Sequence, residues 1–183
     1  MKKNNASLLA TLFLVGMLGF IYYMTMPQRV SDSTDLSEFS TPKALEHIRN
    51  VAQKPHYIGS QNHQVVADYL IQELKKLGLN PQIQEGTTLT EWGNLVKSKN
   101  IIARIDGTNS SKALLLLSHY DSAPHSFSFG ASDDASGVAT ILEGIRAFLH
   151  HKATHKNDII ILFSDAEELG LNGAALFVTQ HQW

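Results

Sequence analysis

Charge is absent from a long stretch near the start of the chain. Residues 7–26, SLLATLFLVGMLGFIYYMTM, contain no Asp, Glu, Lys or Arg. As a helix this segment would span about 30 Å, the thickness of the hydrocarbon core of a bilayer. It is apolar on every side, which disfavours a buried helix of a soluble domain. We therefore expect residues 7–26 to form a transmembrane helix.

Two basic residues, Lys2 and Lys3, precede this apolar stretch. The positive-inside rule therefore predicts that residues 1–6 are cytoplasmic and that the rest of the chain lies on the extracytoplasmic or lumenal side. A cleaved signal peptide is the competing interpretation. Its apolar core usually runs for only about 7 to 15 residues and ends at small residues, which the closing YYMTMPQ lacks.

After a polar linker at residues 27–40, apolar positions follow helical and strand-like spacings in turn. A first helix is expected with Thr41 as its N-cap and Pro42 next, running to about Gln53. A second helix follows Ser60 as N-cap and ends at Gly78. Strands are predicted at 81–84, 100–107, 113–119 and 158–164, and further helices at about 135–150 and 172–180.

The alternation of strands and helices indicates the fold class. Helices of this length between strands are typical of α/β domains with helices on both faces of a mostly parallel sheet. The runs at 113–119 and 158–164 are apolar almost throughout, as expected for strands that are covered on both faces. We expect one such domain over residues 41–183.

Composition narrows the possible functions. Seventeen acidic and fifteen basic residues give a net charge of −2, and no basic stripe with interleaved aromatic residues is present. A nucleic-acid partner is therefore not expected. The chain has no cysteine, which excludes disulfides, thiolate metal sites and a cysteine nucleophile.

Polar side chains follow the two apolar strands and begin the helix between them. In open α/β sheets, function gathers at the carboxyl ends of the strands, where loops lead into helices. We therefore expect these groups to meet at one edge of the sheet: His119, Asp121, Asp133, Asp134, Asp165, Glu167 and Glu168.

This set of side chains suits a metal ion. Imidazole nitrogen and carboxylate oxygen are ligands of zinc and related divalent ions. Asp121 lies two positions after His119, so it can accept the second N–H of the imidazole. Glu167 and Glu168 are neighbours and cannot point the same way. One can bind the metal while the other acts as a general base on the adjacent water.

Three segments in this order closely resemble the successive motifs of the M28 family of zinc peptidases, the co-catalytic aminopeptidase group. They are HYDS at 119–122, GASDDASGVATILEGIR at 130–146 and FSDAEELGLNGAALFV at 163–178. The segment at 54–78 is similar to the lead-in helix of membrane-bound members of the endoplasmic-reticulum and vacuolar type. The resemblance covers roughly residues 40–183 and implies a mixed, mainly parallel sheet sandwiched by helices, as in zinc-dependent exopeptidases.

The resemblance also implies roles for individual residues. His119 would bind one zinc ion, Asp133 would bridge two, and Glu168 would bind the other. Glu167 would be the general base, and Asp121 the aspartate that supports the imidazole. The family further implies a cis peptide bond between Asp133 and Asp134, and two zinc ions that polarise the scissile carbonyl and supply hydroxide.

The family completes its site with another acidic ligand and another histidine, which would lie beyond Trp183. We therefore expect this chain to be the N-terminal part of a longer membrane-anchored metallopeptidase, an aminopeptidase with peptide substrates. One alternative is a non-catalytic relative or incomplete fragment that serves as an interaction domain. The other is an enzyme with amidohydrolase or glutaminyl cyclase chemistry on a similar site.

Overall fold

The computed structural model describes residues 4–26, 35–90, 93–109 and 112–180. The chain divides into two compact units, residues 1–31 and 32–183, and each is described by itself. Lys2 and Lys3, on which the predicted membrane orientation depends, lie outside the described residues, as does most of the predicted linker.

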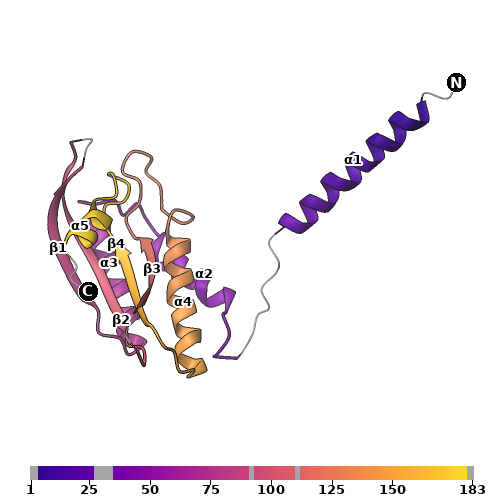
Figure 1. Ribbon diagram of the computed structural model, residues 1–183. Coiled ribbons are helices and arrows are strands. Elements are labelled where there is room, and N and C mark those ends of the chain that lie inside the picture. The colour runs from indigo at the N-terminus through magenta and orange to yellow at the C-terminus, as the bar shows by residue number, and fades with distance from the viewer. Residues whose placement is uncertain (1–3, 27–34, 91–92, 110–111, 181–183) are drawn as a thin grey trace. The chain divides into compact units, whose positions relative to one another are not determined.

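In its described part, the first unit contains the helix α1, Asn4–Thr25 (Figure 1). Its segment Ala6–Thr25 has a mean hydropathy of 1.9, and none of it is buried in the structure. This helix is long and apolar enough to cross a membrane. A signal sequence near an N-terminus meets the same criterion.

The second unit is built on a four-stranded sheet with the order β1-β2-β4-β3 (Figure 1). Strand β3 pairs with β4 in parallel, whereas β2 is antiparallel to both β1 and β4. The predicted mixed α/β class is therefore confirmed. The strands are β1 Gln82–Leu89, β2 Leu95–Ile105, β3 Ala113–His119 and β4 Asp158–Ser164.

The predicted parallel majority is not found among the described strands. A parallel pair needs a crossover connection of about a dozen residues or more, usually a helix. The β3–β4 pair has one in helix α4, Ala135–His151. Strands β1 and β2 are joined directly through residues 90–94, so they can only pair as an antiparallel hairpin.

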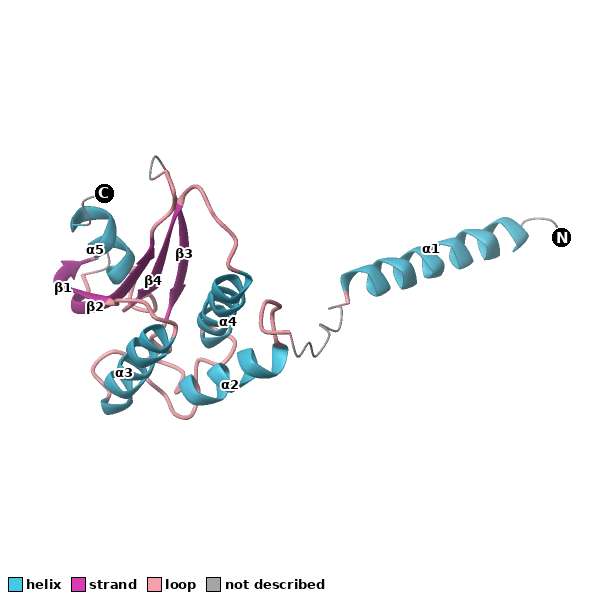
Figure 2. Cartoon of the chain, turned by 90° about the horizontal axis from the view of Figure 1, so that it is seen from below, coloured by secondary structure: helices cyan, strands magenta, loops and turns pink. Residues whose placement is uncertain are grey.

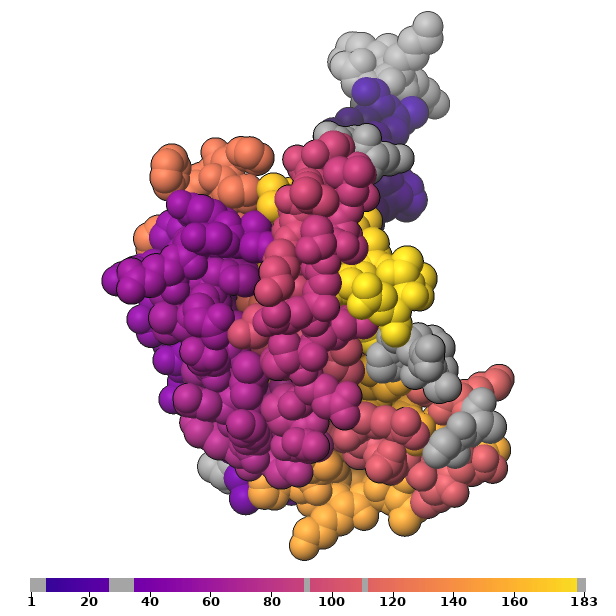
Figure 3. Space-filling view, turned by 90° about the vertical axis from the view of Figure 1, so that its left-hand side faces the viewer, coloured from indigo at the N-terminus to yellow at the C-terminus, as the bar shows by residue number. Residues whose placement is uncertain are grey.

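Helices cover both faces of the sheet, as predicted. Helices α2 (Thr41–Val51), α3 (Gln61–Lys76) and α4 lie on one side, and α5 (Asn172–Gln180) lies on the other (Figure 2). Figure 3 views the β1 edge of the sheet, with α3 and α5 to either side of it. The larger core, between the sheet and α2–α4, includes Leu70, Ile101, Leu142, Ile161 and Phe163; the smaller, under α5, comprises Ile102, Ile160, Leu162 and Phe177.

The starts of helices α2 and α3 can be compared with their predicted N-caps. Helix α3 is capped as predicted, because Ser60 Oγ accepts a hydrogen bond from the amide of His63 at 3.3 Å. The N-cap of α2 is Ser40 rather than the predicted Thr41, and this helix ends at Val51. The backbone N–H of Ser40 is held by the Glu143 carboxylate at 2.7 Å, which fixes the helix start one residue earlier.

The hairpin strands are longer than predicted. Polar side chains interrupt the apolar pattern over the extra residues, where pairs such as Glu85 with Lys99 and Thr87 with Lys97 face each other. Here the antiparallel backbone hydrogen bonds, rather than apolar burial, continue the strands. Strand β4, in contrast, is buried at every position, as its apolar run predicts. The same expectation is wrong for β3, which lies at the edge of the four described strands and exposes Leu114, Leu115 and Leu117.

Candidate active site

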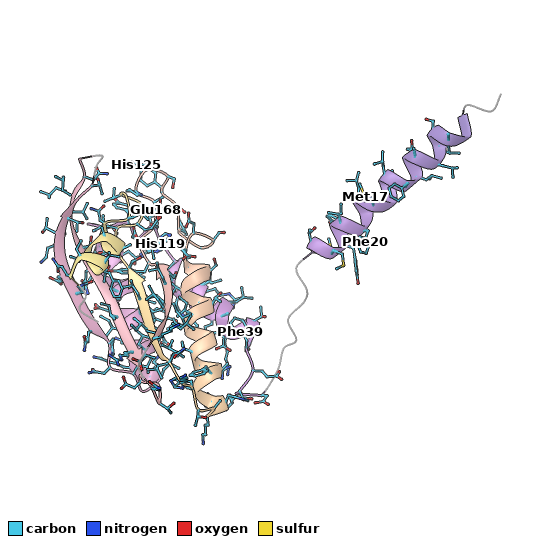
Figure 4. The ribbon with its side chains drawn as sticks, in the orientation of Figure 1. Met17, Phe20, Phe39, His119, His125 and Glu168 are labelled. Atoms are coloured by element: carbon cyan, nitrogen blue, oxygen red, sulfur yellow. The ribbon has the colours of Figure 1, made fainter. Side chains whose placement is uncertain are left out.

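Two neighbouring strands end at the same level of the sheet. In the parallel β3–β4 pair, His119 is the partner of Ser164, so the residues that follow both strands emerge side by side. The amide of Tyr120 continues this pairing by donating to the carbonyl of Ser164 at 3.1 Å. Figure 4 shows His119 and Glu168 at this edge, with His125 in the loop beyond.

His119 is surrounded by carboxylates. Its Nε2 lies 2.9 Å from Asp133 Oδ1 and 3.8 Å from Glu167 Oε2. Its Nδ1 lies 3.1 Å from the carbonyl oxygen of Asp121 and 3.4 Å from Asp121 Oδ1. Burial alone would lower the pKa of His119, but Asp121, Asp133 and Glu167 outweigh it and raise the pKa to about 9.

Asp121 holds more than the imidazole. Its side chain is buried, and its Oδ1 and Oδ2 accept hydrogen bonds from the backbone N–H groups of Glu167 and Glu168, at 3.0 and 3.2 Å. The sequence predicts a contact between Asp121 and His119. It gives no sign that the same carboxylate also fixes the backbone of both glutamates.

The two acids at the start of α4 have different surroundings. The Asp133–Asp134 peptide bond is cis, as the family resemblance implies. Asp134 is the N-cap of α4: its Oδ1 accepts from the amide of Gly137 at 2.9 Å, and its Oδ2 accepts from Ser118 Oγ at 2.6 Å. Asp133 does not cap the helix, and its carboxylate, 78% exposed, is directed at His119.

A side chain at position 137 would displace the capping carboxylate of Asp134. A Cβ atom there would lie 2.5 Å from both carboxylate oxygens of Asp134, closer than packed atoms can approach. The DDASG segment is therefore a helix cap that leaves its first acid available to the site.

Glu167 and Glu168 lie in the turn after β4. The Glu167 carboxylate is 37% exposed and faces His119. Burial, followed by the negative charge of Asp133, raises the pKa of Glu168. Carboxylates from the start of α4 and from this turn therefore gather around one imidazole, an arrangement that a cation stabilises.

The donor chemistry of these residues fits zinc. His119 presents Nε2 to the carboxylates while Asp121 contacts Nδ1, which is how a metal-binding histidine is usually oriented. Within the described parts of the chain, no three His, Asp or Glu side chains form a group that could hold an ion. His119, Asp133 and Glu168 are thus suitable ligands by type, but they do not form an enclosed metal site in this arrangement.

Two further residues, Asp165 and His63, lie beside the site, and only Asp165 has a signal in the sequence. Asp165 is fully buried, and its Oδ1 lies 2.7 Å from Nε2 of His63, a residue 102 positions earlier. Asp165 is recognisable in the sequence as a polar residue after a strand, but its partner is not.

The C-terminal part of the second unit matches a known family. Residues 100–183 match the model described as Peptidase family M28. The chain is 34% identical to a vacuolar membrane protease of Candida tropicalis, over 74% of this chain and 16% of that protein. It is 29% identical to the vacuolar membrane protease of Candida glabrata, over all of this chain and 21% of that protein. The chain thus spans about a fifth of the length of these curated relatives.

Solved structures with a similar fold agree with this match. A Zn-dependent exopeptidase from Parabacteroides distasonis superposes with a TM-score of 0.62 and 31% identity, over 73% of this chain and 49% of that one. A glutaminyl cyclase from Porphyromonas gingivalis gives 0.63 and 27%, over 74% and 50%. A leucine aminopeptidase precursor from Bacteroides thetaiotaomicron gives 0.63 and 26%, also over 74% and 50%. The predicted zinc exopeptidase fold is therefore confirmed.

Proposed function

We propose that this chain, whose residues 100–183 match the model of peptidase family M28, forms part of a membrane-anchored zinc aminopeptidase. The observation that carries this proposal is the meeting of His119, Asp133 and Glu167 at one edge of the sheet. These side chains come from a strand end, a helix start and the turn after a second strand. Nothing in the stability of an α/β domain requires acidic groups to converge there.

Three residues would hold the metal: His119, Asp133 and Glu168. The raised pKa of Glu168 is consistent with this role, since its carboxylate lies among other negative charges that a divalent cation would neutralise. Further ligands would come from outside the described residues. Zinc, when bound, acts as a Lewis acid on the scissile carbonyl and makes a water molecule acidic enough to attack at neutral pH.

Glu167 would act as the general base. Its carboxylate is exposed enough to meet a substrate, and its backbone is fixed by Asp121. In the proposed reaction Glu167 takes a proton from the attacking water and gives it to the nitrogen of the departing amine as the peptide bond breaks. Asp121 keeps both His119 and the turn that carries Glu167 and Glu168, the glutamate turn, in place during this transfer.

Helix α1 would anchor the enzyme in the membrane. The names of the vacuolar relatives and the apolar length of α1 support this part of the proposal. With Lys2 and Lys3 in the cytoplasm, the peptidase domain would face the extracytoplasmic or lumenal side.

The function is tested by following release of the N-terminal amino acid from unblocked peptides, and from the same peptides with an acetylated N-terminus. We expect hydrolysis of the unblocked peptides only, and its loss on addition of a zinc chelator. Glu167→Gln should lower kcat by about 10²- to 10⁴-fold, the usual contribution of a general base. Glu46→Gln, an exposed position on α2, is the matched control and should keep full activity. A Glu167→Gln variant with unchanged kcat would contradict the proposal.

A second candidate is glutaminyl cyclase chemistry, which is favoured by the structural similarity to glutaminyl cyclases. A peptide that begins with glutamine separates the two reactions. A cyclase joins the N-terminal amine to the side-chain carbonyl and releases ammonia, leaving the peptide bond intact. A peptidase consumes water and releases free glutamine. We expect free glutamine.

A further inference from the structure

One histidine of helix α3, His63, contacts the residue that follows β3 and the residue that follows β4. The side chain of His63 is 12% exposed, and its Nε2 lies 2.7 Å from Asp165 Oδ1. Its ring is stacked on that of Tyr120, with centroids 5.0 Å apart and an angle of 23° between the planes. His63 is also fixed at its backbone, because its amide donates to the N-cap Ser60.

The two residues that His63 contacts belong to different segments of the site. Tyr120 lies between His119 and Asp121 and is almost fully buried. Its hydroxyl donates to the carbonyl of Lys99 at 2.8 Å. Asp165 begins the turn that carries the two glutamates, and its Oδ2 accepts from the amide of Lys99 at 2.8 Å. Both residues are thus tied to the same point of β2.

Asp165 also determines the direction of the glutamate turn. Its Oδ1 accepts a hydrogen bond from the amide of Ala166 at 2.8 Å. Ala166 has a φ of 52°, a left-handed conformation that is unfavourable for a residue other than glycine and is held by its surroundings. The amides of the next two residues then bind Asp121. Without the contact to His63, a buried carboxylate would lose one of the donors that fix it.

We propose that His63 is a positioning residue that keeps Tyr120 and Asp165 in register, so that Glu167 and Glu168 face His119. The side-chain partners of His63 in the described structure are Asp165 and Tyr120, and neither is assigned to the metal or to the reacting atoms. His63 would influence catalysis indirectly, because it contacts Asp165 and Asp165 holds the glutamate turn. The part of this inference that concerns catalysis rests on the proposed peptidase function, whereas the part that concerns the turn does not.

The test compares three variants of the full chain: His63→Leu, His63→Gln and His47→Leu. Leucine removes the hydrogen bond to Asp165, whereas glutamine can still donate to it from its Nε2. His47 on α2 is a matched control, because it is also partly buried and bonded to a tyrosine, Tyr69, with its Nδ1 2.7 Å from the hydroxyl. Its pKa is lowered by burial, as expected for a neutral structural histidine.

Two measurements are made on each variant: amide hydrogen exchange at residues 166–168, and kcat and KM for peptide hydrolysis. For His63→Leu we expect at least about tenfold faster exchange at these amides and a kcat about 10- to 100-fold lower, the range found when support of a metal site is removed. KM should change much less. His63→Gln should recover most of both losses, and His47→Leu should show neither.

Unchanged exchange at residues 166–168 in His63→Leu would overturn the inference, as would equal effects in His47→Leu. If the wild-type protein hydrolyses no peptide, the proposed function fails, but the exchange comparison still decides whether His63 holds the turn. Should His63→Leu not fold, His63→Asn takes its place. Its amide is too short to reach Asp165, so the same faster exchange is expected.

Discussion

At the scale of single residues, His119 combines burial with three acidic neighbours. Its raised pKa of about 9 means that the imidazole is protonated at neutral pH in the metal-free protein. An imidazole in an unfolded chain has a pKa of about 6.5. The folded state therefore binds the proton more tightly than the unfolded state does.

This difference predicts how the stability of the metal-free protein depends on pH. The contribution from His119 is fully present below about pH 6.5 and is lost as the pH rises through about 9. At about 1.4 kcal/mol for each pKa unit, it amounts to at most about 3 to 4 kcal/mol. Urea unfolding of protein treated with a chelator should show the free energy of unfolding falling over this range. In His119→Gln this fall should be much smaller, and an equal fall in both proteins would contradict the assignment.

The sequence is informative about the acids near His119 because apolar runs mark where strands end. His119 and Glu167 follow two such runs, and the parallel pairing of β3 with β4 brings them together. The contact between His63 and Asp165 could not be predicted in this way. It depends on how α3 is rotated against the sheet, which is decided by packing between residues 102 positions apart.

At the scale of elements, a buried ion pair on α4 binds the segment that precedes α2, residues 36–40. Glu143 is fully buried, and its carboxylate accepts hydrogen bonds from Arg146 at 2.6 and 2.7 Å and from the amide of Ser40 at 2.7 Å. Arg146 also donates to the carbonyl oxygens of Leu36 and Glu38. The segment before α2 is thus attached to α4 by charged hydrogen bonds.

Removing the acid from this network should therefore be costly. Glu143→Ala leaves the Arg146 charge and the amide of Ser40 without their buried partner. We expect the free energy of unfolding to fall by about 3 to 5 kcal/mol, and amides 36–40 to exchange faster. Glu85→Ala is the control, because it removes an exposed ion pair with Lys97 and should cost no more than about 1 kcal/mol. Equal losses in the two variants would show that the network contributes little.

The elements themselves could be predicted to different degrees. Strands β3 and β4 were predictable to the residue because their apolar runs are continuous. The hairpin was not, because many of its additional residues are polar and are held by strand pairing. The predicted parallel majority is not found among the described strands, because an apolar run does not indicate strand direction. Nor does it guarantee burial, since the apolar strand β3 is largely exposed.

At the scale of the whole molecule, the central question is on which side of the membrane the second unit lies. The chain contains no cysteine, so single cysteines can be introduced as labels without background. Suitable positions are Asn5, in the first turn of α1 and before its uncharged stretch, and Asp106, whose side chain is 80% exposed in the second unit. In sealed vesicles with the cytoplasmic side outward, a membrane-impermeant maleimide should label Asn5→Cys at once and Asp106→Cys only after detergent is added. Labelling of Asp106→Cys in intact vesicles would place the domain in the cytoplasm.

Zinc binding by the purified protein tests the proposed metal site most directly. It is measured by competition with a chromogenic chelator for the wild type, His119→Ala and His47→Ala. We expect the wild type and His47→Ala to bind zinc with similar affinity, and His119→Ala to bind it at least about 100-fold more weakly, because an imidazole ligand is lost. A folded wild-type protein that binds no zinc, or a His119→Ala variant that binds it equally well, would contradict the assignment of His119 as a zinc ligand.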